Sequence, residues 1–154
     1  NRLQGASSGE YAQDVANHIR ASMQLHAGVF RTQASMDEGV KKIAELRNRV
    51  NSVGLKDHSK VFNTARIEAL EVENLIEAAQ ATMVSAAARK ECRGAHTVSD
   101  YERPADDPVA PLGRDDANWM KHTLWHSESN SLTYKPVKLK PLTVDSVPPK
   151  VRTF

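Results

Sequence analysis

Apolar residues recur at every third or fourth position in three long stretches of the chain, which is the spacing of amphipathic helices. The first stretch, from about Glu10 to Phe30, has apolar positions at Ala12, Val15, Ile19, Met23, Ala27 and Phe30. The second has them at Met36, Val40, Ile43, Leu46, Val50 and Val53. The third runs from about residues 61–63 to Cys92, with an inner face of Ile67, Leu70, Leu75, Ala78, Thr82 and Ala86.

Residues at the ends of these stretches agree with helix boundaries. Ser35 is the expected N-cap of the second helix, and Glu38 three residues later completes a capping box. Gly54 and Gly94 supply the flexible residues that stop the second and third helices. Arg93 and its basic neighbours lie in the expected last turn of the third helix, where the helix dipole favours cations. The stretch around Arg93 and Gly94 therefore fits an ordinary helix C-terminus.

Three amphipathic helices with short connections predict a mainly α fold, an antiparallel three-helix bundle of the spectrin-repeat type over residues 1–94. In the second half of the third helix, residues 78–90, small side chains lie on all sides. Because alanine lets another backbone approach closely, this half-helix predicts a second packed surface beyond the bundle core.

The composition changes after Gly94. Residues 95–116 carry six acidic and two basic residues and three prolines, and residues 95–118 are predicted to form an acidic, proline-containing loop. Residues 119–154 form an extension in which two alternating runs, 119–126 and 131–139, flank the polar sequence SESN and predict a β-hairpin. Since a two-stranded hairpin is not stable alone, we expect it to lie on another surface.

Bulk composition narrows the classes of function. A formal net charge of +2 is too small to indicate nucleic-acid binding, and the single cysteine excludes an internal disulfide. No apolar run approaches the roughly 18 residues of a membrane-spanning helix, so the chain is expected to be soluble. The chain opens on Asn1 and not on methionine, and we expect it to be a piece of a longer protein.

No residue set completes a reaction centre. His122 and His126 have the spacing of a helical metal pair, but the motif lacks the glutamate of zinc proteases and lies in a predicted strand, so we interpret them as surface histidines on one strand face. Cys92 and His96 lack a third group that would make a nucleophile. The seven glycines include no GxGxxG phosphate loop. We therefore expect no catalytic, cofactor-binding or metal-binding residue in these 154 residues.

Five sequence blocks in order resemble the C-terminal region of the succinate dehydrogenase flavoprotein family. They are MQLHAGVFRT, FNTARIEALEVENLIEAAQATMVSA, ARKECRGAHTVSDY, RDDANWMKHTL and the terminal PPKVRTF. The resemblance covers about residues 10–154. Fumarate reductase flavoproteins and L-aspartate oxidase share parts of the pattern, and the terminal block favours succinate dehydrogenase.

The resemblance implies a full subunit that oxidises succinate to fumarate at covalently attached FAD and passes electrons to an iron–sulfur subunit and a quinone site held by membrane anchor subunits. It places the complex at the cytoplasmic face of a bacterial inner membrane or the mitochondrial matrix face. The FAD-binding and substrate-binding residues of the family lie upstream of this chain. The expected partner of the helices and tail is the flavin-binding domain, and the candidate docking residues are Arg93, Gly94, His96, Trp119 and His122.

Two other interpretations remain open at this point. The chain could be the corresponding domain of a fumarate reductase or an L-aspartate oxidase. It could also be an independent three-helix module that binds a separate protein.

Overall fold

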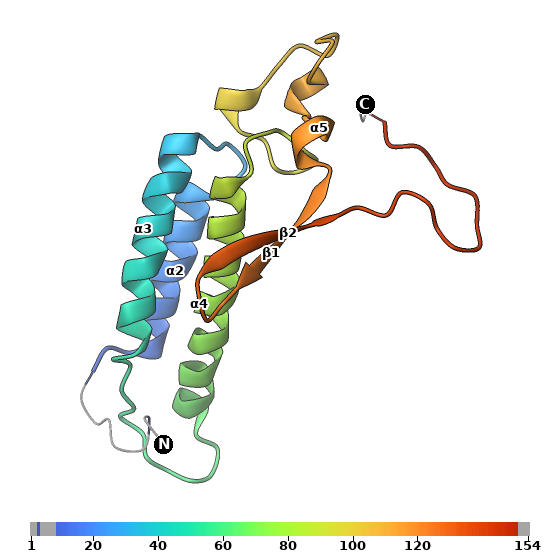
Figure 1. Cartoon of the computed structure of the whole chain (residues 1–154). Coiled ribbons are helices and arrows are strands. Elements are labelled where there is room, and N and C mark those ends of the chain that lie inside the picture. Colours follow the sequence, from blue (N-terminus) through green and yellow to red (C-terminus); the bar gives the residue numbers. More distant parts are fainter. Residues whose placement is uncertain (1–2, 4–8, 151–154) are drawn as a thin grey trace.

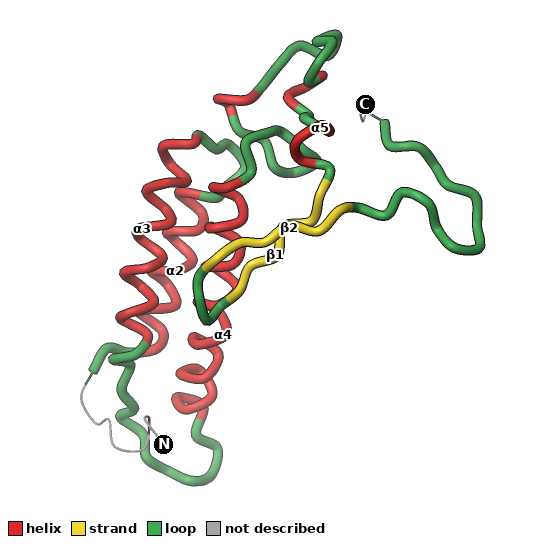
Figure 2. Tube along the Cα trace, viewed as in Figure 1, coloured by secondary structure: helices red, strands yellow, loops and turns green. Residues whose placement is uncertain are grey.

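Three long helices lie side by side in the computed structural model, which describes Leu3 and residues 9–150 (Figure 1). They are α2 (Ala12–His26), α3 (Gln33–Val50) and α4 (Thr64–Ala88). The remainder contains two short 3-10 turns at Ser99–Tyr101 and Pro111–Gly113, the one-turn helix α5 (Asp116–Trp119), and the strands β1 (Lys121–His126) and β2 (Ser131–Pro136). Figure 2 shows the result, a mainly helical chain with one small antiparallel sheet, as predicted. The end of the predicted tail, residues 151–154, lies outside the described residues.

The apolar stripes of α2 and α3 form the core as the sequence indicated. Val15, Ile19, Ile43 and Leu46 are each no more than 1% exposed. Phe30 is the exception, with 89% of its surface exposed. Because α2 ends at His26, Phe30 lies in the connection to α3 and has no helical face on which to be buried.

The buried face of α4 differs from the prediction. Its core positions are Ala69, Val72, Ile76, Ala79 and Met83. Ile67 and Leu70, which were expected to face inward, are 57% and 47% exposed. Apolar residues lie on more than one side of this helix, so their spacing alone did not select the face that packs on α2 and α3.

Three further predicted helix boundaries were wrong. Thr32, and not Ser35, caps α3, and its Oγ1 accepts a hydrogen bond of 3.1 Å from the Ser35 backbone N–H. Gly54 has no positive φ, and its N–H donates to the Glu10 carbonyl at 3.2 Å, which joins the end of α3 to the start of α2. The third error concerns α4, which ends at Ala88 and not near Cys92, so Gly94 lies outside the helix.

The predicted hairpin is present and lies on α4. β1 pairs with β2 in antiparallel register, with His122 opposite Lys135 and His126 opposite Ser131. β1 packs against α4, in agreement with the expectation that another surface covers the hairpin. Figure 1 shows the hairpin lying across α4.

The acidic segment is held at its two ends. Val98 is fully buried in a small core cluster with Met36, Ala86 and Ala87. Beyond it, the N–H of Leu112 donates to the carbonyl of Pro104 at 3.1 Å and closes a neck beneath the loop of residues 105–111. This segment is therefore anchored to the helices, with only its middle part projecting.

Candidate functional site

The four residues Arg93 to His96, here called the RGAH turn, form a tight reversal of the chain beyond α4. The Arg93 N–H donates to the His96 carbonyl at 2.8 Å, and the His96 N–H donates to the Arg93 carbonyl at 3.0 Å. Gly94 has a φ of +58°, whereas Ala95 has no positive φ, the combination of a type II′ turn. No atom lies within 4 Å of a Cβ built on Gly94, so the tip of the turn faces open space.

Glu91 lies at the centre of a charged cluster just before this turn. Its side chain is fully buried. It accepts hydrogen bonds from Arg89 Nη1 at 2.6 Å and from Arg93 Nε at 2.7 Å. A third donor is the Asp115 backbone N–H at 2.9 Å. Two guanidinium groups and an amide thus compensate one desolvated carboxylate, as burial of a charge requires.

Arg93 extends the cluster to α5. Its Nη2 donates to Asp116 Oδ1 at 2.6 Å, and the same oxygen accepts from Arg114 Nε at 2.7 Å. The hydrogen bond from Arg114, followed by the one from Arg93, holds the pKa of Asp116 below its usual value. We call Arg89, Glu91, Arg93, Arg114 and Asp116 the arginine–acid cluster.

His96 is held as a neutral imidazole. Its Nδ1 lies 3.0 Å from Arg31 Nη1, and because a guanidinium only donates, this nitrogen must be the acceptor. Its Nε2 therefore carries the proton and donates to the Arg89 carbonyl at 3.0 Å. Burial is the main cause that lowers the pKa of His96, and the positive charges of Arg31 and Arg89 act in the same direction.

Arg31 brings the end of α2 to the RGAH turn. Its Nε and Nη2 donate to the carbonyls of Gly28 and Ala27 at 2.8 and 3.0 Å, at the C-terminal end of α2. The carbonyl of Arg31 accepts from the Ser99 N–H at 2.9 Å, next to buried Val98. The end of α2 and the segment after the turn are thereby fixed to each other.

Arg89 connects the same region to the hairpin. Its two Nη atoms donate to the carbonyls of Trp119 and Lys121 at 2.9 and 2.8 Å. The guanidinium carbon lies 5.2 Å from the centre of the Trp119 ring, and Tyr134 packs edge-on against that ring at 5.9 Å. His122 lies on the other, exposed face of β1.

The structure thus divides the five candidate docking residues. Arg93, Gly94 and His96 share one turn, and Trp119 is joined to it through Arg89. His122 makes none of these contacts.

Sequence reasoning missed the role of Arg31, Glu91, Arg89 and Asp116. The alternation of Arg89, Glu91 and Arg93 was a usable signal, because every second residue of an extended segment faces the same side. That signal was hidden by the prediction of a helix continuing to Cys92.

Apolar side chains are exposed close to the RGAH turn. Val29 and Phe30 precede Arg31 in the connection between α2 and α3, and both are largely exposed. This end of the molecule therefore combines a satisfied polar interior with unburied apolar surface, which is typical of an interaction site.

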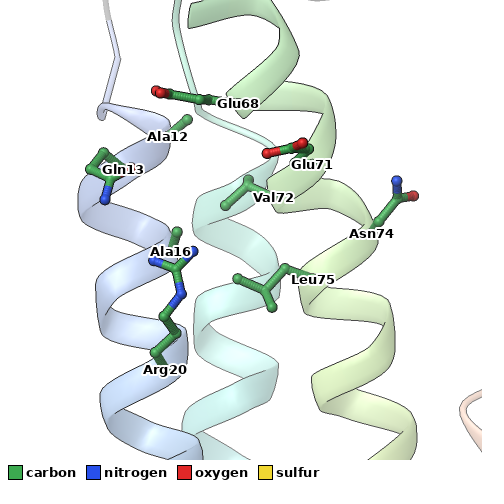
Figure 3. Close-up of a pocket in the computed structure, with 9 residues that line it drawn as sticks. All are labelled: Ala12, Gln13, Ala16, Arg20, Glu68, Glu71, Val72, Asn74 and Leu75. Carbon is green, nitrogen blue, oxygen red and sulfur yellow. The ribbon is translucent and has the colours of Figure 1, made fainter. Parts of the chain in front are cut away.

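An open groove of about 370 Å³ lies toward the other end of the helices, between the N-terminal halves of α2 and α4 (Figure 3). Its lining residues are Ala12, Gln13, Ala16, Arg20, Glu68, Glu71, Val72, Asn74 and Leu75. Among the residues that the structure describes, no group of three histidine, cysteine or acidic side chains is placed to hold a metal ion. None of the helices among the described residues has the length and hydropathy that a membrane-spanning helix requires.

Known proteins resemble nearly the whole chain. The protein family described as fumarate reductase flavoprotein C-term matches residues 16–154. The chain is 42% identical to the succinate dehydrogenase flavoprotein subunit of Coxiella burnetii over 90% of its length, and 37% identical to the mitochondrial succinate dehydrogenase [ubiquinone] flavoprotein subunit of Oryza sativa over 100%. It spans 22% and 24% of the lengths of these relatives.

Solved structures agree with the sequence relatives. A quinol fumarate reductase FrdA chain of E. coli superposes with a TM-score of 0.75 at 30% identity, covering 94% of this chain and 23% of that one. With a family match over residues 16–154 and a fold shared with this solved chain, the protein belongs to the succinate dehydrogenase and fumarate reductase flavoprotein family, as its C-terminal domain.

Proposed function

We propose that this chain is the C-terminal domain of an FAD-dependent succinate dehydrogenase flavoprotein that oxidises succinate to fumarate. The observation that carries the proposal is the similarity to succinate dehydrogenase flavoprotein subunits over 90% or more of the chain. Because the chain spans only 22% and 24% of those relatives, we assign FAD attachment and substrate chemistry to the remainder of the polypeptide. In this proposal the 154 residues bind no FAD by themselves and are inactive alone.

The role proposed for the domain is docking. The exposed Val29 and Phe30 lie next to the RGAH turn, and the turn presents Gly94 with open space around it. A glycine at that place lets another backbone approach closely. We infer that the flavin-binding domain of the same polypeptide covers this end of the helices.

The five candidate residues then have two kinds of role. Arg93, His96 and Trp119 already have partners within the chain. Their proposed role is to hold the docking surface in place without touching the partner domain. Gly94 and His122 are exposed and are proposed to touch the partner directly.

The proposed organisation follows the sequence-based boundaries. In this proposal residues 1–94 carry the antiparallel three-helix, spectrin-repeat-like bundle, residues 95–118 connect it to the tail, and residues 119–154 carry the hairpin and the tail. The further partners are the iron–sulfur subunit and the membrane anchor subunits of the assembled complex. Through them the domain lies at the cytoplasmic or matrix face of the membrane without entering it.

Two exposed phenylalanines allow a matched test of this docking surface. In the full flavoprotein, Phe30→Ser should lower the flavin retained per polypeptide, because it removes apolar contact area from the proposed interface. Phe62→Ser is the control, since Phe62 is 96% exposed but precedes α4 at the opposite end of the helices. Flavin absorbance per mole of purified protein is the measurement. Equal retention in both variants would place the interface elsewhere.

A second candidate function is fumarate reduction by the same kind of subunit. It is favoured by the TM-score of 0.75 to the E. coli quinol fumarate reductase chain. Rates of succinate oxidation and fumarate reduction by the full enzyme, measured with the same quinone pool, distinguish the two directions. L-aspartate oxidation, the third possibility in this family, is tested by adding aspartate to the same assay.

A further inference from the structure

The ring of His96 lies between two arginines that reach it from different parts of the chain. Arg31, in the connection between α2 and α3, places its Nη1 3.0 Å from the Nδ1 of the ring. Arg89, at the end of α4, accepts a hydrogen bond of 3.0 Å from Nε2 with its backbone carbonyl. One hydrogen bond on each ring nitrogen therefore joins the end of α2 to the end of α4.

The contact between His96 and Arg31 exists only while the ring is neutral. A guanidinium donates and does not accept, and a protonated imidazole donates from both of its nitrogens. A proton on Nδ1 would bring two donors and two positive charges together at a distance of 3.0 Å. The bond to the Arg89 carbonyl does not require the neutral ring, since Nε2 donates to it in both states. Protonation thus opens one side of the ring and leaves the other side closed.

The charged groups around His96 come from each segment packed against it. Arg31 and Arg89 both disfavour a further positive charge on the ring. Glu91 favours one, but its buried carboxylate is already paired with Arg89 and Arg93. Burial of the ring is the largest cause, and with the two arginines it holds the pKa of His96 below its ordinary value.

We propose that His96 and Arg31 form a pH-sensitive switch, in which a proton taken up from solvent at Nδ1 releases Arg31 and uncouples the end of α2 from the RGAH turn. In the open form His96 is an ordinary imidazole with a pKa of about 6.5, so the open form binds more protons than the closed form. The closed form is therefore fully favoured above about pH 6.5. Below that pH the ratio of open to closed form rises by up to about tenfold per pH unit, until the lower pKa of the closed form is reached.

The switch acts on the surface at which docking is proposed. Val29 and Phe30 directly precede Arg31 and are 73% and 89% exposed. The Arg31 carbonyl accepts from the Ser99 N–H at 2.9 Å, so the backbone and the side chain of Arg31 together hold this connection against the segment after the RGAH turn. Release of the side chain loosens the two exposed apolar residues relative to the turn. This consequence rests on the proposed function, whereas the switch itself involves contacts within the described residues.

Amide hydrogen exchange of the full flavoprotein, followed by mass spectrometry between about pH 7.5 and pH 5.5, tests the switch. Rates are expressed as protection factors, which remove the intrinsic pH dependence of exchange. The diagnostic peptide spans the RGAH turn and Ser99, whose amides are closed by the hydrogen bonds described above. Its protection should fall by up to about tenfold over the pH unit below 6.5. The peptide around Gly54, whose N–H donates to the Glu10 carbonyl at the opposite end of the helices, should keep its protection.

Two substitutions establish whether His96 is the titrating group and Arg31 its partner. His96→Gln keeps an acceptor and a donor but takes up no proton, so the protection of the turn should not change over this pH range. Arg31→Met removes the opposing guanidinium, so the turn should be less protected at neutral pH and should lose most of its pH dependence. Arg20→Met is the matched control, because Arg20 lies exposed on α2 and donates to Asn17 at 3.1 Å. This control should keep the full pH dependence.

Several outcomes contradict the switch. They are constant protection of the turn in the natural protein, an equal fall in His96→Gln or Arg31→Met, and an equal fall at Gly54, which would indicate that acid unfolds the whole domain. Flavin absorbance of the same samples tests the proposed function separately. A preparation without flavin contradicts that function, whereas bound flavin with no pH dependence at the turn contradicts the switch alone.

Discussion

Glu91 is the residue whose environment explains most of the site. Its carboxylate is fully buried and is compensated by Arg89 and Arg93 together with the Asp115 amide. Glu91→Gln leaves both guanidinium groups near an uncharged amide, and removing one partner of a buried ion pair costs about 3–5 kcal/mol. Chemical denaturation of the chain should show a loss of this size in the free energy of unfolding.

The control for this measurement is Glu102→Gln, which neutralises an exposed carboxylate eleven residues further along the chain. Its expected effect is within about 0.5 kcal/mol, as for most surface substitutions. A loss below about 1 kcal/mol for Glu91→Gln would show that the cluster relaxes and is not a fixed structural element.

His96 predicts a pH dependence of stability in a narrow window. Its folded-state pKa lies below the value of about 6.5 of a free imidazole. Between those two values the unfolded chain binds more protons than the folded chain, so the stability contributed by neutral His96 is present above about pH 6.5 and is lost as the pH falls through the folded pKa. Thermal midpoints measured from pH 7.5 to pH 5 should therefore fall more steeply for the natural chain than for His96→Gln, which cannot titrate.

Carboxylates whose pKa is lowered by hydrogen bonds, such as Asp116, also lose their contribution in acid, but at lower pH and equally in both proteins. Parallel curves for the natural chain and His96→Gln would contradict a lowered pKa of His96 in the folded chain.

At the scale of elements, residues beyond Gly94 belong to the packing of the helices. Val98 is fully buried against Met36 and Ala86, and the Gln33 N–H donates to Asp100 Oδ2 at 2.8 Å at the start of α3. A chain ending at Tyr101 should therefore be more stable than one ending at Gly94, by at least the roughly 1.5–3 kcal/mol of burying a valine.

Cooperative thermal unfolding of the two truncated chains measures this difference. Both lack α5 and the hairpin, so the comparison isolates residues 95–101. Identical midpoints would support a bundle that is complete at Gly94.

The elements were predictable where one period dominates the sequence. α2, α3 and the hairpin follow clear apolar spacing, and their existence was predicted correctly. The end of α4 was not, because residues 86–92 have good helix propensity and nothing local opposes a helix there. What ends α4 is tertiary. An extended Arg89 to Arg93 places both arginines on Glu91, and the partners of Glu91 and Arg93 at the start of α5, Asp115 and Asp116, lie more than twenty residues away.

The position of the candidate site was predictable from the sequence, but its contacts were not, because they join residues far apart in the chain. The RGAH motif marked the right place, but one of its side-chain partners, Arg31, is 65 residues from His96 in the chain. Spacing within one element cannot reveal a contact of that kind.

At the scale of the whole molecule, the proposed docking role of the RGAH turn predicts that substitutions there lower the amount of bound flavin and leave the turnover of each bound flavin nearly unchanged. In the full flavoprotein, Arg93→Ala and His96→Ala should reduce the amount of bound flavin, since each disturbs the docking end. Turnover per bound flavin should stay within a few-fold of the natural enzyme, because neither side chain is proposed to transfer a proton. Arg103→Ala, at an exposed position in the acidic segment, is the control.

The measurement is steady-state turnover normalised to flavin absorbance. A fall of about 100-fold or more per flavin, with flavin content unchanged, is the size expected for the loss of a general acid or base. Such a result would move the RGAH turn from the docking surface to the active centre.

The neck at Pro104 and Leu112 has a consequence for how this domain tolerates change in length. Both flanks of the projecting loop are held independently of it, by the Leu112 N–H at the neck and by the Cys92 N–H, which donates to the Gly113 carbonyl at 2.8 Å. Extra residues placed between 105 and 111 lengthen a closed loop, and each doubling of loop length costs only about 0.6 kcal/mol. We therefore expect residues inserted at this tip to be accommodated by the chain without displacing the hairpin.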